Sequence, residues 1–506
     1  MRRSLKVNIA ANLLGRSFTA FCGIVFLPIY LHFLDVEYYG LFALLNSYMI
    51  VAAVLDAGFS AALTREIAKL SDSAPERMRD LVWTVSLPYC AATLAIAIAV
   101  YLAAPWIAPV ILHEGRDLNQ PMLVASVGYA GFAMTMQLPV FLYTGGLAGL
   151  QRQDLANGIN IVSTTLRYGG SLLLLWSFSA SVPMLMIWQA AVATLTAIAA
   201  LTVLWRHLPS NHRRPRFRRV FLLEIWRFAA GTGGVALLGM FVFQSDKLVI
   251  GALLPLKEVG IYMVASVIAT NLMMLAQPVA AAAFPRLSQL HARNDVAAIR
   301  TTFRKLSQLV AVTVLPVATI IAFFPQQTLE IWTGNFAVAV GSAPILRLLA
   351  IGVGCNALAC VPYSLILAGG RTRSLFLLTA LSCVFVLPSL YFMTMWLGAL
   401  GTASVMLGYL LLLLVGYAIL LHSLLGSHEW SRWIAVDILL PQVLIVVVAA
   451  AAAILAPAVA PRETLFLVLA TTWITASAVA ALAMPSLRCQ ALSYLRHLRA
   501  IVQATS

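Results

Sequence analysis

The sequence predicts an all-α membrane protein with about 14 transmembrane helices, and two observations carry this prediction. The first is composition: 61% of the residues are hydrophobic and only 10% are charged, which excludes a soluble globular domain. The second is the distribution of bases. Of the 33 Lys and Arg residues, 25 lie in the terminal segments and alternate loops, whereas the opposite loops hold only Arg116, Lys257 and Arg462. Because basic loops stay cytoplasmic, both termini are expected in the cytoplasm.

The apolar stretches have the length of membrane spans. Each contains about 20 residues or more, the number needed to cross a hydrocarbon core about 30 Å thick. The predicted spans are residues 9–33, 40–62, 82–108, 122–148, 159–178, 183–204, 226–254, 259–284, 306–324, 344–368, 375–396, 400–421, 438–457 and 463–483. The first begins close to Met1-Arg2-Arg3 and is too long for the core of a cleavable signal peptide, so none is expected.

A basic segment divides the spans into two sets. Residues 206–221 include Arg213, Arg214, Arg216, Arg218 and Arg219 and are predicted to form a cytoplasmic linker. The predicted regions are an N-terminal lobe (1–205, spans 1–6), a C-terminal lobe (222–422, spans 7–12), spans 13 and 14 (423–485) and a tail (486–506). The tail places apolar and basic residues on opposite helical faces, which predicts an amphipathic helix on the inner leaflet.

A weak internal repeat supports the two lobes. At an offset of 220 residues, FLDVEYYGLFA (33–43) aligns with LLPLKEVGIYM (253–263), and Gly40 falls on Gly260. Further on, LTREIAKL (63–70) falls on AFPRLSQL (283–290). Because each lobe has an even number of spans, the repeats share one orientation and are predicted to be related by an axis along the membrane normal.

The sequence gives no sign of catalytic, metal or cofactor chemistry. The six cysteines have no metal-ligand spacing, and we expect them to be small buried apolar side chains. No GxxxxGK[ST] loop and no nucleophile–base pattern occurs. The net charge of +15 is explained by the positive-inside bias and by attraction to anionic membrane lipids, rather than by nucleic acid. We therefore expect no enzyme activity, no cofactor and no metal.

Bases inside spans are candidate functional residues, because each costs about 2.5–3.5 kcal/mol at the middle of a helix on insertion scales. Arg167 lies near the middle of its span, Arg16 in the cytoplasmic third of the first span, and Lys247 in the outer half of the seventh. These three are predicted to line a cavity and bind an anionic substrate. Structural pairing within the helix bundle is the alternative for each.

Acids inside spans are fewer. Asp246, beside Lys247, is the only carboxylate that the predicted spans place well inside the membrane, and it is a candidate proton or cation site. Asp56 approaches the cytoplasmic end of the second span near Arg65 and Glu66. These three residues form a candidate cytoplasmic gate.

Several segments resemble the polysaccharide transporter family, the Wzx-like oligosaccharide flippases. They are the N-x-x-G motif from Asn12 to Gly15, LPIYLHFLDVEYYGLFALL (27–45), LDAGFSAALTRE (55–66), FQSDKLVIGALLPLKEVGIYMVAS (243–266) and FPRLSQL (284–290). Together with the length and the number of spans, the resemblance covers essentially the whole chain.

The resemblance implies a member of the multidrug/oligosaccharidyl-lipid/polysaccharide exporter superfamily, with two six-helix lobes in a V around a central cavity and two extra C-terminal helices. The implied substrate is an undecaprenyl-diphosphate-linked oligosaccharide. It would be moved by alternating access from the cytoplasmic to the periplasmic leaflet of the bacterial inner membrane, for O-antigen, capsule or exopolysaccharide assembly. A polysaccharide polymerase and a chain-length regulator are candidate partners.

Three alternatives remain open. A lipid II flippase shares the implied fold, but the arginine-rich first span associated with that subfamily is absent. A cation-coupled multidrug antiporter would carry more acids than bases inside its spans, which is the reverse of this sequence. A membrane polymerase or ligase acting on lipid-linked glycans would need a large outward-facing loop, and the largest predicted outward loops, 109–121 and 325–343, are short.

Overall fold

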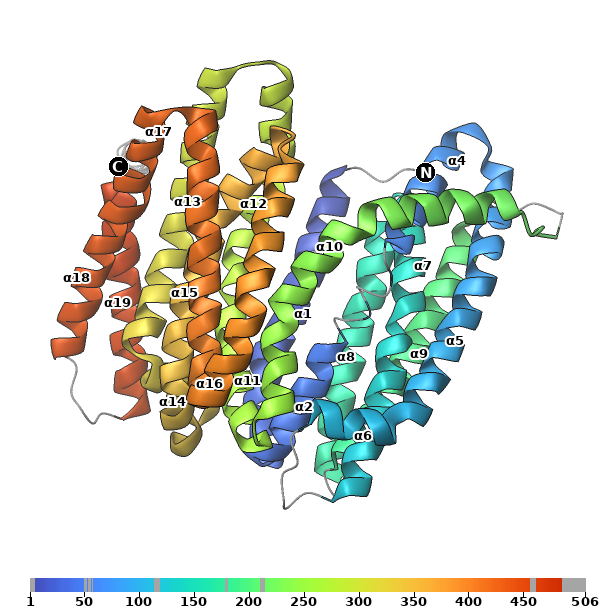
Figure 1. Ribbon diagram of the computed structural model, residues 1–506, viewed down its shortest axis with the longest axis horizontal. Helices are drawn as coiled ribbons and strands as arrows, with labels where there is room; N and C mark the ends of the chain where they lie inside the picture. The colour runs from blue at the N-terminus through green and yellow to red at the C-terminus, as the bar shows by residue number, and fades with distance from the viewer. Residues whose placement is uncertain are drawn as a thin grey trace, which may run out of the picture. The chain divides into compact units, whose positions relative to one another are not determined.

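The computed structural model describes residues 5–49, 52, 56, 58–112, 119–177, 181–209, 214–455 and 461–484. These residues contain helices and no strand (Figure 1), which confirms the predicted all-α class. The chain divides into two compact units, Met1–Met263 and Val264–Ser506. The lobe boundary predicted at residues 206–221 differs from the division between these compact units, and it stays a prediction. The amphipathic tail helix predicted for 486–506 lies outside the described residues.

The first unit is a bundle in which α9 holds the central position. Helix α8 packs against α1 and α9, α6 packs against α5 and α9, and α7 packs against α4 and α9. Its helices are α1 (Leu5–Phe33), α2 (Val36–Tyr48), α4 (Phe59–Ser73), the short 3₁₀-helix η1 (Pro75–Arg77), α5 (Met78–Ile111), α6 (Gln120–Thr135), α7 (Gln137–Gly149), α8 (Gln153–Ser177), α9 (Val182–His207) and α10 (Arg219–Leu253), with α11 (Leu256–Asn271) reaching into the second unit.

One end of this bundle has a tightly packed apolar core. Leu63 and Ile67 of α4, Leu81 of α5, Leu142 of α7 and Leu204 of α9 are all fully buried there. Ile225, near the beginning of α10, is also fully buried in this core. The beginning of α10 is therefore attached to the bundle by the same apolar packing that joins α4, α5, α7 and α9.

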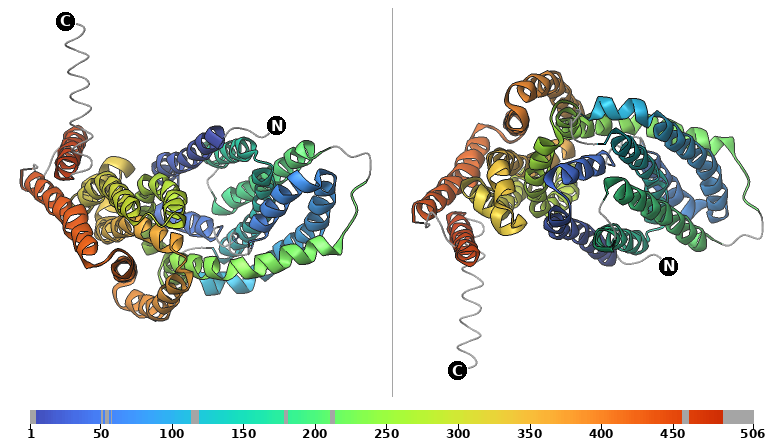
Figure 2. Two further views of the ribbon diagram at one scale, coloured as in Figure 1. Left: turned by 90° about the horizontal axis from the view of Figure 1, so that it is seen from above. Right: turned by 90° about the horizontal axis from the view of Figure 1, so that it is seen from below.

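Helix α10 has two parts with different directions. Figure 1 shows its first part running across the ends of neighbouring helices, after which the helix turns and runs in the direction of the bundle helices. Seen from above and below, the first part follows one edge of the bundle (Figure 2). The sequence Gly231-Thr232-Gly233-Gly234 lies within this helix, and glycine weakens helical structure enough to accommodate a change of direction.

Helices α2 and α11 cross at the two glycines that the internal repeat aligns. A Cβ atom on Gly40 would lie 2.7 Å from the backbone nitrogen of Gly260, and one on Gly260 would meet the carbonyl oxygen of Val36. Only glycine allows two helix backbones to approach this closely. The contact joins the two positions that the 220-residue offset aligns, and the repeat axis stays a prediction.

In the second unit, α15 is the central helix and packs against α12, α13, α14 and α16, while α18 and α19 pack on each other and on α13. The helices are α12 (Met273–Ala292), α13 (Val296–Phe323), α14 (Pro325–Thr333), α15 (Phe336–Ala368), α16 (Thr372–Leu425), α17 (Ser427–Arg432), the π-helix η2 (Trp433–Leu439), α18 (Leu440–Leu455) and α19 (Arg462–Ala483).

Helix α16 is a hairpin of two helices rather than one long rod. Gly398 interrupts it with φ of 59° and ψ of −143°, a conformation available essentially only to glycine. Across the hairpin the hydroxyls of Thr394 and Thr402 lie 2.8 Å apart, and Arg371 donates to Ser423 near the open end. In a straight helix those last two residues would be about 78 Å apart. The two spans predicted at 375–396 and 400–421 are therefore the two arms.

Most of the other predicted spans fall on helices, but the span predicted at 40–62 is wrong as a single helix, because α2 ends at Tyr48 and α4 begins at Phe59. Among the described residues, nine helices are long and apolar enough to cross a membrane by length and composition alone. They are Pro75–Ile111, Gln120–Gly149, Val182–His207, Leu256–Ala292, Val296–Phe323, Phe336–Ala368, Thr372–Leu425, Ser427–Leu455 and Arg462–Ala483. One of these is the α16 hairpin. Helix α8 is not among the nine, because one of its faces is polar.

Candidate functional site

Arg167 lies on α8, between α1 and α9. One Nη donates to the Met49 sulfur at 3.8 Å. Its Nε is fully buried and has no hydrogen-bond partner among the described residues. A guanidinium is always charged and carries five N–H donors, so weak contact with a thioether leaves most of its binding capacity unused. This donor set suits a phosphate or carboxylate ligand.

Arg167 belongs to a polar face of α8 that follows the helix toward its basic-loop end. Asn157, Thr164 and Ser171 recur every seven residues, or two helical turns, and Thr164 and Ser171 lie three and four residues from Arg167, which places them on its side. The Thr164 hydroxyl lies 3.3 Å from that of Thr19 on α1, and Ser171 accepts from the Gln189 amide at 3.4 Å. Among the described residues the Gln189 Oε1 is buried and has no hydrogen-bond partner.

Arg16 is carried by α1, the helix that packs directly on α8. Its side chain lies outside the described residues. The two bases assigned to the same cavity from the sequence therefore come from neighbouring helices, and the role of Arg16 stays a prediction.

Asp246 and Lys247 are neighbours on α10 but have different partners. The Tyr262 hydroxyl on α11 donates to Asp246 Oδ2 at 2.7 Å, while Oδ1 is buried without a hydrogen-bond partner among the described residues. The Lys247 ammonium donates to the Gln244 amide oxygen at 2.7 Å, one turn earlier on the same helix. Both side chains are buried. Asp246 thus has an acceptor atom available for a proton or cation.

The candidate gate residues divide into two groups. Asp56 is buried and accepts from the Ser60 hydroxyl and the Tyr89 hydroxyl, each at 2.7 Å. Glu66 is also buried, and Arg65 lies 3.9 Å from its carboxylate. Asp56 therefore connects the beginning of α4 to α5, whereas Arg65 and Glu66 form a pair one turn further along α4. The role of these three residues as a cytoplasmic gate stays a prediction.

A buried ion pair in the second unit was not identified from the sequence. Asp437 of η2 is completely buried, and Arg304 of α13 donates to both of its oxygens at 3.0 Å. Gln308 adds a third hydrogen bond at 2.6 Å. Asp437 lies directly before the span predicted at 438–457, so no role inside the bundle was predicted for it. The π-helical turn directs Asp437 toward α13, so the ion pair joins η2 to α13 within the second unit.

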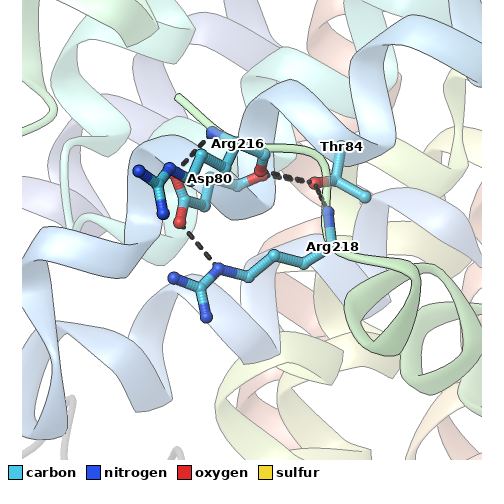
Figure 3. Close-up of polar contacts among 4 residues, drawn as sticks. All are labelled: Asp80, Thr84, Arg216 and Arg218. Carbon is cyan, nitrogen blue, oxygen red and sulfur yellow. Dashed lines mark hydrogen bonds and ion pairs between the residues drawn. The ribbon is translucent and has the colours of Figure 1, made fainter. Parts of the chain in front are cut away.

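A second polar cluster involves the basic linker (Figure 3). Asp80 of α5 accepts from the backbone nitrogen of Arg216 and from Nε of Arg218, each at 2.8 Å. The Thr84 hydroxyl accepts from the Arg218 backbone nitrogen at 3.0 Å. Asp80 and Thr84 are one helical turn apart on α5, but their sequence gave no indication that a segment about 135 residues later lies against them.

Comparisons with known proteins agree with these features. The family model described as polysaccharide biosynthesis protein matches residues 5–291, and the model named MatE matches residues 233–392. A Shigella flexneri protein that carries the provisional description O-antigen transporter is 27% identical over 187 residues. That match covers 37% of this chain and 43% of the relative, so the chain matches less than half of the length of that protein.

Solved structures share the fold. The lipid II flippase MurJ in an inward closed conformation has a TM-score of 0.71 at 12% identity, and the match covers 94% of this chain and 98% of that chain. An inward-facing multidrug resistance MATE family transporter has a TM-score of 0.55 at 15% identity, over 84% of this chain and 95% of that chain. At these identities the likeness establishes the fold.

Proposed function

Because the chain belongs to the polysaccharide biosynthesis protein family, within the multidrug/oligosaccharidyl-lipid/polysaccharide exporter superfamily, we propose that it is a flippase for lipid-linked oligosaccharides. The proposed cargo is an undecaprenyl-diphosphate-linked repeat unit. It passes from the cytoplasmic to the periplasmic leaflet for assembly of O-antigen, capsule or exopolysaccharide. The observation that carries the proposal is Arg167, a cation on the polar face of α8 with a buried donor that no described residue satisfies.

The diphosphate is the part of the cargo that needs a protein. An isolated ion moved into hydrocarbon costs tens of kcal/mol by Born solvation. A cationic polar path lowers that barrier, and the prenyl chain remains in lipid. We assign the diphosphate to Arg167, with Arg16 and Lys247 as further bases on the path. Asn157, Thr164 and Ser171 offer hydrogen-bond groups to the sugar hydroxyls.

The membrane potential favours the proposed direction. Outward movement of a charge away from a negative interior gains about 2.3 kcal/mol per charge per 100 mV. A diphosphate carrying roughly two charges would gain about twice that amount. Asp246, with Oδ1 unsatisfied, is the residue we propose for any additional coupling to protons or sodium.

We place the protein in the bacterial inner membrane with both termini in the cytoplasm. The support is the concentration of Lys and Arg in alternate loops, which sets orientation during insertion. A polymerase and a chain-length regulator are proposed partners on chemical grounds, since a flipped repeat unit must be polymerised on the outer side.

The experiment replaces Arg167 with Ala and with Lys in cells that depend on this chain for surface polysaccharide. Arg167→Ala is expected to reduce export at least about tenfold, because losing one charge-assisted contact costs about 1.5–3 kcal/mol. Lipid-linked units should accumulate in the cytoplasmic leaflet. Arg167→Lys should retain part of the activity, since a point charge still attracts phosphate without the bidentate geometry.

The matched control is Arg347→Ala. Arg347 is also a base within a helix, but its Nε donates to the Ala322 carbonyl at 3.0 Å, whereas the Nε of Arg167 is buried without a described partner, so we expect Arg347 to be dispensable for export. Protein abundance is measured for every variant. Wild-type export by an abundant Arg167→Ala variant would contradict the assignment.

A further inference from the structure

The segment from Arg214 to Trp226, which we call the strap, comprises the end of the basic linker and the first turns of α10. It lies entirely within the first unit. In Figure 1 the beginning of α10 runs across the ends of the neighbouring helices, so its direction is that of a segment lying along a membrane surface. Helices that lie in this plane are stabilised when one face is apolar and basic residues flank it.

Two attachments hold the strap on the bundle. The first is polar: Asp80 and Thr84 bind the backbone and side chain at Arg216 and Arg218. The second is apolar: Ile225 is fully buried in the core shared by α4, α5, α7 and α9, and Phe221 packs against the same core. Residues 221 and 225 lie one turn apart, so they define the protein-facing side of the helix.

The opposite side of the strap carries large apolar side chains that stay more than half exposed, although the ring of Trp226 also contacts that of Phe59 at 5.8 Å between centroids. Val220 is 63% exposed, Leu223 62% and Trp226 60%. Their three-residue spacing places them on one helical face. Burying such side chains in the acyl boundary of a bilayer is favourable by about 25 cal/mol per Å² of apolar area, and tryptophan is favoured at the headgroup level.

Arginines border this apolar face. Arg214, Arg216 and Arg219 are all exposed, and the carboxylate of Asp80 binds Arg218 rather than these three side chains. Glu224 is the exposed acid on the same turns, so the described strap keeps an excess of positive charge. Guanidinium groups match phosphate oxygens in geometry as well as in charge.

We propose that the strap is a binding element for anionic phospholipid headgroups. Arg214, Arg216 and Arg219 bind headgroup phosphates, while Val220, Leu223 and Trp226 enter the acyl region beside them. The lipid is a resident partner of the protein rather than its cargo. Asp80 acts as a positioning residue, because it fixes the strap without contacting the lipid.

The test titrates the purified full-length protein in detergent micelles with phosphatidylglycerol and, separately, with phosphatidylcholine. Bound lipids are counted by native mass spectrometry. The variant combining Arg214→Gln, Arg216→Gln and Arg219→Gln is expected to raise the dissociation constant of the tightest phosphatidylglycerol site about a hundredfold, with phosphatidylcholine binding unchanged. The single change Arg216→Gln should raise it about fivefold.

The control variant removes the same charge from other exposed positions, through Arg77→Gln, Arg293→Gln and Arg373→Gln, and should bind phosphatidylglycerol as the wild type does. Thermal unfolding verifies that each variant is folded. Equal loss in both triple variants, or none in either, would overturn the proposal. The titration contains no oligosaccharide cargo, so failure of the flippase assignment leaves this test informative.

Discussion

The buried carboxylate of Asp246 is satisfied on one oxygen and open on the other. Tyr262 donates to Oδ2, and Oδ1 has no hydrogen-bond partner among the described residues. Leaving a buried acceptor unpaired costs about 1–3 kcal/mol, and more when the group is charged. Binding a proton or a cation at Oδ1 relieves that cost. Lys247 does not remove the need, because its ammonium bonds to Gln244.

We expect Asp246→Asn to leave the protein abundant but to weaken the dependence of export on the proton or sodium gradient by several-fold, since the amide holds the Tyr262 contact without binding either ion. Export is measured while each gradient is collapsed in turn. Asp154→Asn is the control, because the Asp154 carboxylate is paired with Arg152 at 3.1 Å. Unchanged gradient dependence in Asp246→Asn would make this residue structural.

Individual residues differ in how well the sequence predicted them. Arg167 was identifiable because a base in the middle of a span is costly and is therefore either functional or paired. Asp437 was not, because only the π-helical turn places it inside the second unit opposite Arg304. Asp80 was equally hidden, because its partners Arg216 and Arg218 are far away in the chain. A single sequence therefore predicts well how deep a residue lies in the membrane, but it predicts contacts between distant segments poorly.

At the scale of elements, hydropathy located the helices but not their directions. The two arms of the α16 hairpin were predicted as separate spans, and the Gly398 turn lies between them. Residues 206–221 were predicted as a linker and a span was predicted from 226, whereas the structure continues one helix, α10, from Arg219. Figure 1 shows the first part of this helix lying across the helix ends. An apolar interfacial helix and an apolar span have similar composition, so only the structure distinguishes them.

The basic loops are expected to determine the orientation of the protein in the membrane, and thiol labelling measures that orientation. Ser427 and Ala337 are both exposed. Ser427 lies between the spans predicted at 400–421 and 438–457, on the cytoplasmic side, and Ala337 lies in the outward loop predicted at 325–343. In a cysteine-free background, a cysteine at 427 should resist an impermeant thiol reagent added to whole cells, whereas a cysteine at 337 should react, because the bases concentrate on the Ser427 side. The reverse labelling pattern would invert the proposed topology.

At the scale of the whole molecule, the weak internal repeat aligned two positions, Gly40 and Gly260, that the structure brings into contact. Family membership and the shared fold agree with the all-α membrane class. The fold does not identify the cargo, because proteins that share one fold can transport different substrates. The flippase assignment therefore depends on the cationic polar face of α8.

The most direct measurement follows a lipid-linked oligosaccharide across a bilayer that contains only the purified protein. Undecaprenyl-diphosphate oligosaccharide is placed in proteoliposomes, and the fraction accessible to an external glycosidase is followed with time. We expect the wild-type protein to expose the inner pool at least about tenfold faster than protein-free vesicles, and Arg167→Ala to remain near the protein-free rate. Equal rates for wild-type and protein-free vesicles, under an imposed potential and ion gradient, would contradict the account.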